Sequence, residues 1–440
     1  MPYRDRTDKN ATQQESFYAK LPLRDIADII RFVNERCGFL STMTPLQPRY
    51  AKKVADADSL MAVIIAQATN LGNLAMSQTC DIPYHTLDET YRQYCRLATL
   101  RAANDRVANF IAQLPIFEYY SSDLGALFGA IDGQKFAAAT PTAKARHSRK
   151  YFGRERGVVA FTSLTNHVAT LANLIGAHEH ESHYVFDLCY HNTADIAPTI
   201  ITGDMHSINK MNFAAMYWFE MDFAPRFTNL QAQLKHLFCG DDIEQDDNFR
   251  IKPAGQIDLP AICDDPCVFE QIIASLSVKE MSQQALVRKL CALSPNHRTR
   301  RAVFEFDKLV RSIYTLRYMR DPQLQRNVHR SQNRIEAHHA LRGFIAEVSG
   351  RKHLIGKTDH DIAISNECGR LLANVVTAFN SVLLSQLLER YQREGNEKAL
   401  AMLKKISPVA WRHIHFLGHY TFRNENPIDI AAMLAGLDFL

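Results

Sequence analysis

The sequence contains no long hydrophobic run, no cysteine framework and no apolar N-terminal segment. No apolar stretch approaches the roughly 20 residues that span a bilayer. The polar stretch MPYRDRTDKNATQQES at the start lacks the apolar core of a signal peptide. Nine scattered cysteines indicate free thiols in a reducing compartment, and the closest pair, Cys263 and Cys267, has no second pair at metal-ligand spacing. We therefore expect a cytoplasmic protein that has no membrane segment and no zinc site.

A strong net charge is also absent, which argues against a molecule that binds polyanions over its whole surface. The 51 Lys and Arg exceed the 47 Asp and Glu by only four. Basic residues are nevertheless concentrated in two segments. The first contains Lys144, Arg146, Arg149, Lys150, Arg154 and Arg156, and the second contains Arg298, Arg300, Arg301, Lys308, Arg311, Arg317, Arg320, Arg326, Arg330 and Arg334. Such clusters can follow a phosphate backbone, although each can equally be the solvated face of a helix.

Internal repeats and low-complexity tracts are missing too, and the hydrophobic periodicity divides the chain into parts. Apolar residues at intervals of three and four predict helices before residue 115 and again after residue 230, whereas the region between contains β-type runs. The predicted parts are a disordered N-terminus (1–20), a helical domain (21–115), the first part of an α/β core (116–230), a helical insertion (231–329) and the second part of the core with C-terminal helices (330–440).

The α/β core has a recognisable order of elements. Three successive runs, LGALFGAIDGQKF, GVVAFTSLTNH and VATLANLIGAH, predict an antiparallel meander. A helix, the short strand TIITGDMH, a second helix and a last strand follow. The order β-β-β-α-β-α-β, with Asp132 in the first strand and Asp204 closing the fourth, is that of the ribonuclease-H-like fold. We therefore predict a mixed α/β protein with large all-α parts: a ribonuclease-H-like core that is preceded by a helical domain and interrupted by a helical insertion.

Three carboxylates form the candidate site. In that fold the first and fourth strands are neighbours, so Asp132 and Asp204 would face each other, and Glu336 from a later helix would complete the set. Such oxygen ligands suit Mg²⁺ or Mn²⁺, and two ions about 4 Å apart can promote in-line displacement at phosphorus. Each residue alone has a simpler interpretation: Asp132 as a turn residue, Asp204 as a helix cap and Glu336 as a solvated acid. The order of elements favours the shared site.

Several separated stretches also match one known family in order and spacing. They are ATNLGNLAM (68–76), DGQKF (132–136), YFGRERGV (151–158), YVFDLCYH (184–191), FAPRFTNL (223–230) and SPVAWRHIHFLGHY (407–420). Together they resemble the catalytic region of the Tn-three family, the replicative, cointegrate-forming bacterial DDE transposases. The resemblance covers nearly the whole chain from about Leu21.

The resemblance implies a catalytic triad that binds two Mg²⁺ or Mn²⁺ ions. It assigns Asp132 from the DGQ motif, Asp204 before the second helix, and Glu336, which follows Asn333 by three residues. Glu347 is the rival for the third position because it projects from nearly the same helix face. It lies eleven residues, or about 16 Å, further along the axis, so only one of the two can reach the same ions. The asparagine spacing favours Glu336.

The residues that flank the triad depart from the family pattern in two places. The family commonly has Thr on both sides of the second Asp, where this chain has Gly203 and Met205. It commonly has Gly before the Glu, where this chain has Ile335. Beside the first Asp, we expect Gly133 and Gln134 to end the strand next to a phosphate.

The resemblance also implies an activity and its partners. Water would attack a phosphodiester at each transposon end, and the freed 3′-hydroxyl would then attack target DNA. The implied partners are double-stranded DNA and a second copy of the chain, in the bacterial cytoplasm and on the nucleoid when DNA is bound, without a membrane. The residues expected to contact DNA are Arg146, Arg149, Lys150, Arg154, Arg156 and Arg334, with Arg154 and Arg156 as phosphate clamps.

Two other interpretations remain open at this point. The chain could be a non-catalytic DNA-binding remnant that regulates transposition, or a generic ribonuclease-H-like nuclease that cuts without joining. Members of the family usually carry a large N-terminal region that recognises the terminal inverted repeats, and here the catalytic region begins soon after Met1. We therefore expect either a truncated or split member of the family, or a protein whose end recognition is supplied elsewhere.

Overall fold

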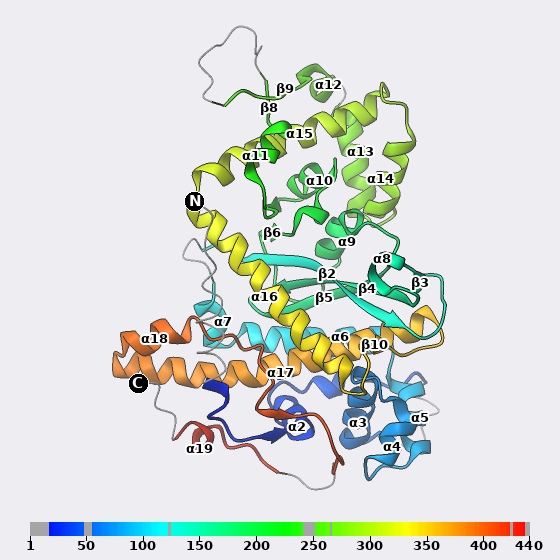
Figure 1. Cartoon of the computed structure of the whole chain (residues 1–440), viewed down its shortest axis with the longest axis vertical. Coiled ribbons are helices and arrows are strands. Elements are labelled where there is room, and N and C mark those ends of the chain that lie inside the picture. Colours follow the sequence, from blue (N-terminus) through cyan, green and yellow to red (C-terminus); the bar gives the residue numbers. More distant parts are fainter. Residues whose placement is uncertain are drawn as a thin grey trace.

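A sheet lies between a lower layer of helices and an upper, mainly helical part, so the predicted mixed α/β class is confirmed (Figure 1). The stretch expected to be disordered lies outside the described residues up to residue 16. Phe17 and Tyr18 are instead buried, and the Tyr18 hydroxyl donates to the Ser407 carbonyl at 2.8 Å, so the expectation is wrong for these two residues. The computed structural model describes residues 17–47, 55–121, 125–240, 251–264, 266–422 and 426–435.

The lower layer is built from the first and last parts of the chain. Its long helix is α17 (Asp359–Glu394), against which α2, α3, α6 and α7 pack. A short parallel pair, β1 (Arg24–Asp25) with β11 (Ile414–His415), joins the two chain regions. The remaining elements are α2 (Ile26–Cys37), η1 (Phe39–Thr42), α3 (Ala57–Ala68), α4 (Gly72–Gln78), α5 (Tyr84–Tyr94), α6 (Leu97–Ala112), α7 (Pro115–Tyr119), α18 (Glu397–Leu403) and α19 (Ile430–Leu434).

The central sheet contains the predicted antiparallel meander. Strand β4 pairs antiparallel with both β2 and β5, which confirms the three successive strands. On its other edge β2 pairs parallel with β6, and β6 pairs parallel with β7, which gives the order β3-β4-β2-β6-β7. The strands are β2 (Phe128–Ala138), β3 (Arg146–His147), β4 (Arg156–Thr165), β5 (Val168–Gly176), β6 (Ile200–Thr202), β7 (Asp222–Phe223) and β10 (His353–Leu354).

Both faces of the sheet are covered. Because side chains alternate along a strand, Ala130 and Ile131 of β2 belong to opposite faces. Ala130 packs in a small cluster with Ile335 of α16 (Pro322–Glu347). Ile131 packs on the other side in the cluster that contains Phe186 of α9. The short helices on that side and at the strand ends are α8 (Arg149–Phe152), η3 (Glu181–Tyr184), α9 (Val185–Tyr190), η4 (Met205–Ser207) and α10 (Asn212–Trp218).

The region predicted as a helical insertion forms the upper part of the molecule (Figure 1). It is mostly helical and also contains one short parallel strand pair, β8 with β9. The predicted boundary at residues 329 and 330 falls inside α16, which runs unbroken from Pro322 to Glu347. Its elements are α11 (Leu230–Gln233), η5 (Leu234–His236), β8 (Phe238–Cys239), β9 (Gly255–Gln256), α12 (Leu259–Cys263), α13 (Pro266–Ser277), α14 (Gln283–Ala292) and α15 (Arg298–Arg320).

Local signals define the ends of the two long helices. Asp321 caps α16 by accepting from the amides of Gln323 and Leu324, and Pro322 occupies its first turn. Thr358 begins α17 with a capping box. Gly395 ends α17 in the left-handed conformation, with φ of 63°, which glycine adopts without a steric penalty.

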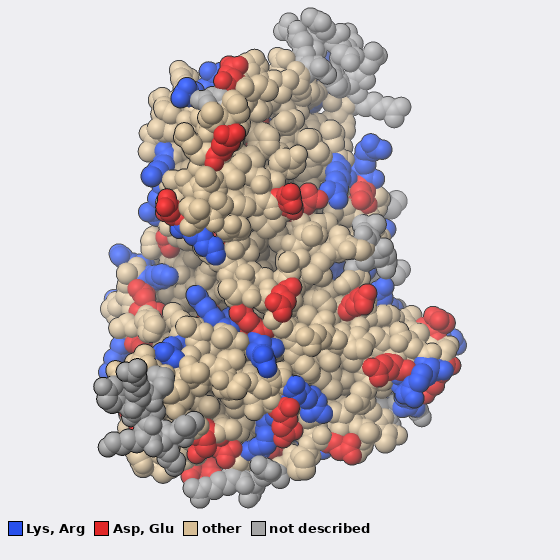
Figure 2. All heavy atoms as spheres, turned by 180° about the vertical axis from the view of Figure 1, so that it is seen from behind, with Lys and Arg blue, Asp and Glu red and all other residues tan. Residues whose placement is uncertain are grey.

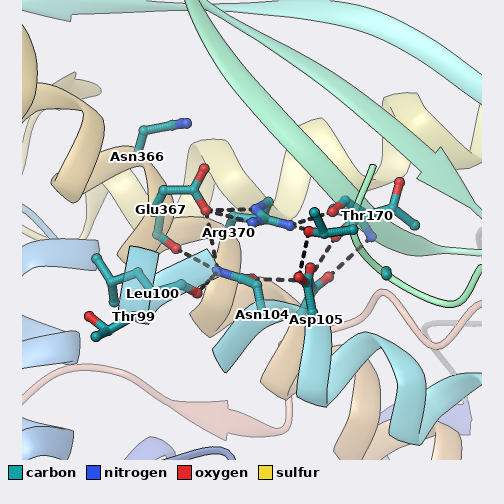
Figure 3. A network of polar contacts seen from close by, with 12 residues as sticks. Thr99, Leu100, Asn104, Asp105, Thr170, Asn366, Glu367 and Arg370 are labelled. Carbon is teal, nitrogen blue, oxygen red and sulfur yellow. Dashed lines mark hydrogen bonds and ion pairs between the residues drawn. The ribbon is translucent and has the colours of Figure 1, made fainter. Parts of the chain in front are cut away.

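Helix α17 is anchored to the sheet by a buried ion pair (Figure 3). The Arg370 guanidinium lies 2.6 Å from Glu367 Oε2, and the two side chains are 1% and 2% exposed. Arg370 also donates to the carbonyls of Ala169 and Thr170 at 3.2 and 2.8 Å, at the start of β5. Asn104 of α6 donates to Glu367 Oε2 at 3.4 Å. The buried charges are thus paired and hydrogen-bonded, which is the condition for tolerating them in a core.

Helix α17 is relevant to the expectation that the chain has no membrane segment. In the described part of the chain it is the single continuous helix that is long and apolar enough to cross a membrane, with a mean hydropathy of 1.6 over 18 residues. The bent pair α3 and α4 would pass the same test only if counted as one span. However, 94% of the α17 window is buried inside the protein, as in the core helix of a soluble protein.

Helices α16 and α17 contact each other closely at a glycine. The buried Arg342 of α16 donates to Asn366 Oδ1 of α17 at 3.2 Å. A Cβ at Gly369 would lie only 2.6 Å from Arg342 Cζ. By contrast, a Cβ at Gly343 of α16 would have its nearest neighbours at an ordinary 3.5 Å.

The same substitution should therefore have opposite effects on the two helices. We expect Gly369→Ala to lower the free energy of unfolding by about 1–3 kcal/mol, because Arg342 must leave its buried position. We expect Gly343→Ala to raise it by roughly 0.5–1 kcal/mol, because alanine restricts the unfolded chain and fits the space. Urea unfolding of both variants measures this, and a stabilised Gly369→Ala protein would contradict the close contact.

Candidate active site at the open edge of strand β2

Asp132 lies within strand β2, opposite Thr162 of β4. On the other edge, β6 pairs with residues 128–130 and β10 with residues 137–138. The segment of β2 between them, which includes Asp132, therefore has no ladder partner on that edge among the described strands. The turn interpretation of Asp132 is wrong, and so is the expectation that Gly133 and Gln134 end the strand, since β2 continues to Ala138.

Asp204 lies two residues after the end of the short strand β6, which is the parallel neighbour of β2. Its carboxylate accepts from the His206 amide at 2.8 Å and caps the short helix η4. The capping role considered from the sequence is therefore present. The strand pairing also brings Asp204 to the edge of the sheet at which Asp132 lies, and the negative charge of Asp204 acts on the Asp132 carboxyl.

Glu336 is an exposed residue of α16, the helix that crosses the sheet in front of β2 (Figure 1). Four residues before it, Gln332 donates to Thr202 Oγ1 at the end of β6 at 3.3 Å. Three residues after it, His339 Nδ1 lies 3.5 Å from Asp132 Oδ2. Positions three and four apart share one face of a helix. Glu336 therefore lies on the α16 face that is held against the two strands bearing the aspartates.

Glu347, the rival third carboxylate, is the last residue of α16 and is exposed. At this end of the helix, the Ala346 carbonyl accepts from the side chain of Asn70 in the lower helical layer at 3.0 Å. The part of α16 that contacts Asp132 is His339, eight residues earlier and about 12 Å away along the axis. The contacts thus favour Glu336 over Glu347 as the carboxylate near the aspartates.

Glu181 is a further carboxylate at this edge that the sequence analysis missed. It begins the short helix η3, and its Oε1 lies 4.0 Å from Lys135 Nζ of β2. A Cβ at Gly133 would come within 2.7 Å of Glu181 Oε2, so only glycine leaves room for this carboxylate beside β2. The glycine of the DGQ motif was the available signal, because a glycine inside a strand often marks a close approach.

Burial and neighbouring charge shift the ionisation of these acids. Burial, the nearby Glu181 and then Asp204 raise the pKa of Asp132 to about 7, against a lowering by the Gly133 amide. Burial is also the first cause that raises the pKa of Glu181, which Lys135 partly offsets. In contrast, burial lowers the pKa of His339 to about 3, so this ring is neutral beside Asp132. The site therefore combines crowded carboxylates with an uncharged imidazole.

The donor set is suitable for a hard divalent cation. Asp132, Asp204, Glu181 and Glu336 offer only oxygen ligands, which is the chemistry of Mg²⁺ and Mn²⁺ sites. The absence of a Cβ at Gly133 also suits a cation site, because it lets the Glu181 carboxylate lie against the strand. As these side chains stand, no three acidic, His or Cys groups in the described ranges are close enough together to hold an ion.

The two departures from the family pattern have local explanations. A Cβ at Gly203 would lie 2.8 Å from the Cβ of Ser207, so the residue before Asp204 must be small here. Ile335, before Glu336, is fully buried against Ala130 and Ala169. These small residues leave the volume that the larger isoleucine side chain fills.

The predicted DNA-contacting residues fall into two groups. Five of them are exposed on or beside α8 and the start of β4: Arg146, Arg149, Lys150, Arg154 and Arg156. Arg334 instead donates to Asn166 Oδ1 at 2.6 Å and to the Tyr120 carbonyl at 2.8 Å, and burial lowers its pKa to about 10. Its guanidinium is used inside the fold, so we remove it from the predicted DNA-contacting set.

The second basic segment, residues 298–334, does not form a continuous positively charged surface. In that segment Arg317 pairs with Asp222 at 2.8 Å, and Lys308 pairs with Glu305 at 2.5 Å. On the face of the molecule seen from behind, Lys and Arg are interspersed with Asp and Glu (Figure 2). The exposed basic residues around α8 are therefore the better candidates for a DNA surface.

The close approach of Glu181 to β2 can be tested by adding a methyl group. We expect Gly133→Ala to displace the Glu181 carboxylate, which is the mobile end of its side chain, at a cost of less than about 1 kcal/mol. The pKa of Asp132 should then fall, because Glu181 is its principal charged neighbour. Carboxyl ¹³C NMR of labelled Asp132 and urea unfolding measure the two effects.

Gly157→Ala is the matched control on the paired strand. Its Cβ would meet the Phe136 carbonyl oxygen at 2.5 Å, and backbone cannot move aside as a side-chain end can. We expect a loss of about 2 kcal/mol or more there. An equally large loss for Gly133→Ala, or an unchanged pKa of Asp132, would contradict the arrangement described for Glu181.

The raised pKa of Asp132 predicts a pH-dependent stability difference. The folded protein keeps this proton up to about pH 7, whereas the unfolded chain releases it near pH 4. The stability that the protonated carboxyl contributes is therefore lost as the pH rises through about 7. In buffer with EDTA we expect Asp132→Asn to match the wild type at pH 4 and to be the more stable protein at pH 8. Urea unfolding at both values measures it, and a pH-independent difference would refute the shift.

Comparisons with known proteins identify the family of the chain. The chain is 24% identical to "Transposase for transposon Tn2501" of Escherichia coli, over 93% of this chain and 40% of the relative. It is 23% identical to "Transposase for transposon Tn4556" of Streptomyces fradiae, over 92% of this chain and 45% of the relative. The chain thus spans less than half the length of these curated relatives. The family described as "Tn3 transposase DDE domain" matches residues 28–420, so the chain belongs to this family.

Proposed function

We propose that the chain is the catalytic part of a DNA transposase, which hydrolyses phosphodiesters at transposon ends and joins the 3′-hydroxyls to target DNA. The family membership and the transposase relatives support this activity. The sheet order also supports a ribonuclease-H-like core: three antiparallel strands are followed by two parallel ones, with β2 in the centre beside β6.

The observation that carries the proposal is the position of Glu336 on α16. This helix is held to the end of β6 through Gln332 and to β2 through His339, four residues before and three residues after Glu336. The same two strands carry or closely precede Asp132 and Asp204. A solvated acid in an arbitrary place on the helix would have no such relation to both strands.

In the proposed mechanism Asp132, Asp204 and Glu336 would hold two Mg²⁺ or Mn²⁺ ions. When bound, these ions would supply activation of the attacking oxygen and stabilisation of the leaving one. The protein positions the phosphodiester and neutralises charge, so the same residues can serve first water and then a 3′-hydroxyl. Asp132 must lose its proton to bind a cation, and a bound ion would favour that loss despite the burial. Glu181 adds negative charge beside Asp132.

The proposed partners are double-stranded DNA and a second copy of the chain. The exposed residues Arg149, Lys150, Arg154 and Arg156 lie around α8, where guanidinium groups can bind phosphates in a bidentate manner. Two DNA ends are joined in one event, so a homodimer would supply one site for each end. We propose that this takes place in the bacterial cytoplasm, on the nucleoid.

A joining assay tests the proposal. The protein is incubated with pre-cleaved transposon ends that carry a 3′-hydroxyl, with supercoiled plasmid and with Mn²⁺. We expect joined products, and a loss of at least about 10³-fold in rate for Asp132→Asn and Glu336→Gln, because each removes a charge that binds metal. Glu347→Gln is the matched control on the same helix and should join at the wild-type rate.

The other outcomes separate the alternatives. Cutting without joining would indicate a ribonuclease-H-like nuclease, and DNA binding without either reaction would indicate a non-catalytic remnant. If Glu347→Gln lost joining and Glu336→Gln retained it, Glu347 rather than Glu336 would be the third carboxylate.

A further inference from the structure

An exposed tyrosine lies close to the candidate site, at a place where the sequence analysis considered only basic residues. Tyr151 belongs to the short helix α8 and is 42% exposed. Lys135 Nζ lies 4.4 Å from the centroid of its ring, and Lys150 Nζ lies 4.8 Å from it. The ring is thus accompanied by two cations and is open to solvent.

Lys135 connects this ring to the carboxylates. The same Lys135 Nζ that lies against Tyr151 is 4.0 Å from Glu181 Oε1. Lys135 is also three residues after Asp132 in β2, about 10 Å along the strand; because side chains alternate, it lies on the face of β2 that approaches Glu181, opposite to Asp132.

The fold holds α8 in an orientation that leaves Tyr151 outside. The neighbouring Phe152 turns inward, and a Cβ at Gly157 would come within 2.5 Å of its Cε2 atom. Glycine at the second residue of β4 therefore makes room for the Phe152 ring, which anchors the helix. Since successive residues of a helix point about 100° apart, Tyr151 is directed away from that anchor.

We infer that Tyr151, between Lys135 and Lys150, is a stacking platform for an unpaired nucleobase of the DNA strand that enters the candidate active site. The inference rests on the proposed function for its substrate. An exposed aromatic ring with adjacent cations is the combination that binds single-stranded nucleic acid, because the ring stacks on the base while the cations bind the backbone. The nearby Arg149 and Arg154 are exposed and extend the positive surface.

A fluorescent base analogue provides the test. The probe is a duplex with a single-stranded flank in which 2-aminopurine occupies the first, second or third unpaired position, with EDTA present so that no cleavage occurs. We expect the wild type to quench at least one position twofold or more. Tyr151→Leu should abolish the quenching and weaken binding by about 5- to 150-fold, the range for the loss of one stacked base.

Matched variants separate stacking from charge and from misfolding. Tyr151→Phe and Tyr151→Trp keep a ring and should quench as the wild type does. Tyr84→Leu, at an equally exposed tyrosine that begins α5, should bind and quench normally. Lys150→Ala should weaken binding and reduce its salt dependence by about one ion while the bound complex remains quenched.

Each remaining outcome decides the question. Quenching by Tyr151→Leu at the wild-type level, or no binding of this probe by the wild type, would overturn the inference. Because the assay needs no metal, it is independent of the proposed reaction. Quenching that depends on Tyr151 in a protein that joins no ends would support the platform and refute the transposase proposal, whereas joining without such quenching would do the reverse.

Discussion

The buried pair of Arg370 and Glu367 is the interaction on which the position of the candidate site depends. Arg370 binds two carbonyls at the start of β5, so α17 is fixed to the sheet rather than merely packed beneath it. One residue before Glu367, Asn366 accepts from Arg342 of α16. The sheet, α17 and α16 therefore form one continuous polar framework. Such buried charges are costly to desolvate, and they tolerate little change because a removed partner leaves the other unpaired.

At the candidate site, by contrast, burial and neighbouring negative charges make the ionised form of Asp132 unfavourable. Asp132 lies in a long strand whose adjoining edge is open, with Glu181 and Asp204 adding negative charge to it. Burial and like charges both disfavour the ionised form that a metal ligand requires. A bound divalent cation would reverse that balance, since it favours the carboxylates that repel one another without it.

The sequence predicted much of the core because its signals are local. Three β-type runs, the first of which contains β2, identified the meander. The boundaries were less predictable: α16 continues through the expected domain limit, and β2 continues through Gly133 and Gln134. A glycine beside an aspartate is typical of a turn, but here it makes room for Glu181, a residue 48 positions away in the chain. Local propensity carries no information about that contact.

The sequence by itself determined the element order, the two aspartates at neighbouring strands, and the family to which the chain belongs. Only the tertiary structure decided which basic and acidic side chains are free to contact DNA or to form the candidate site. The sequence does not distinguish Arg334 from the arginines near it, yet its guanidinium is hydrogen-bonded to Asn166 and Tyr120 inside the fold. Tyr151, by contrast, is exposed between two lysines. The physical reason is that periodicity assigns a residue to a face of its own helix or strand, whereas partners and exposure depend on which other segments cover that face.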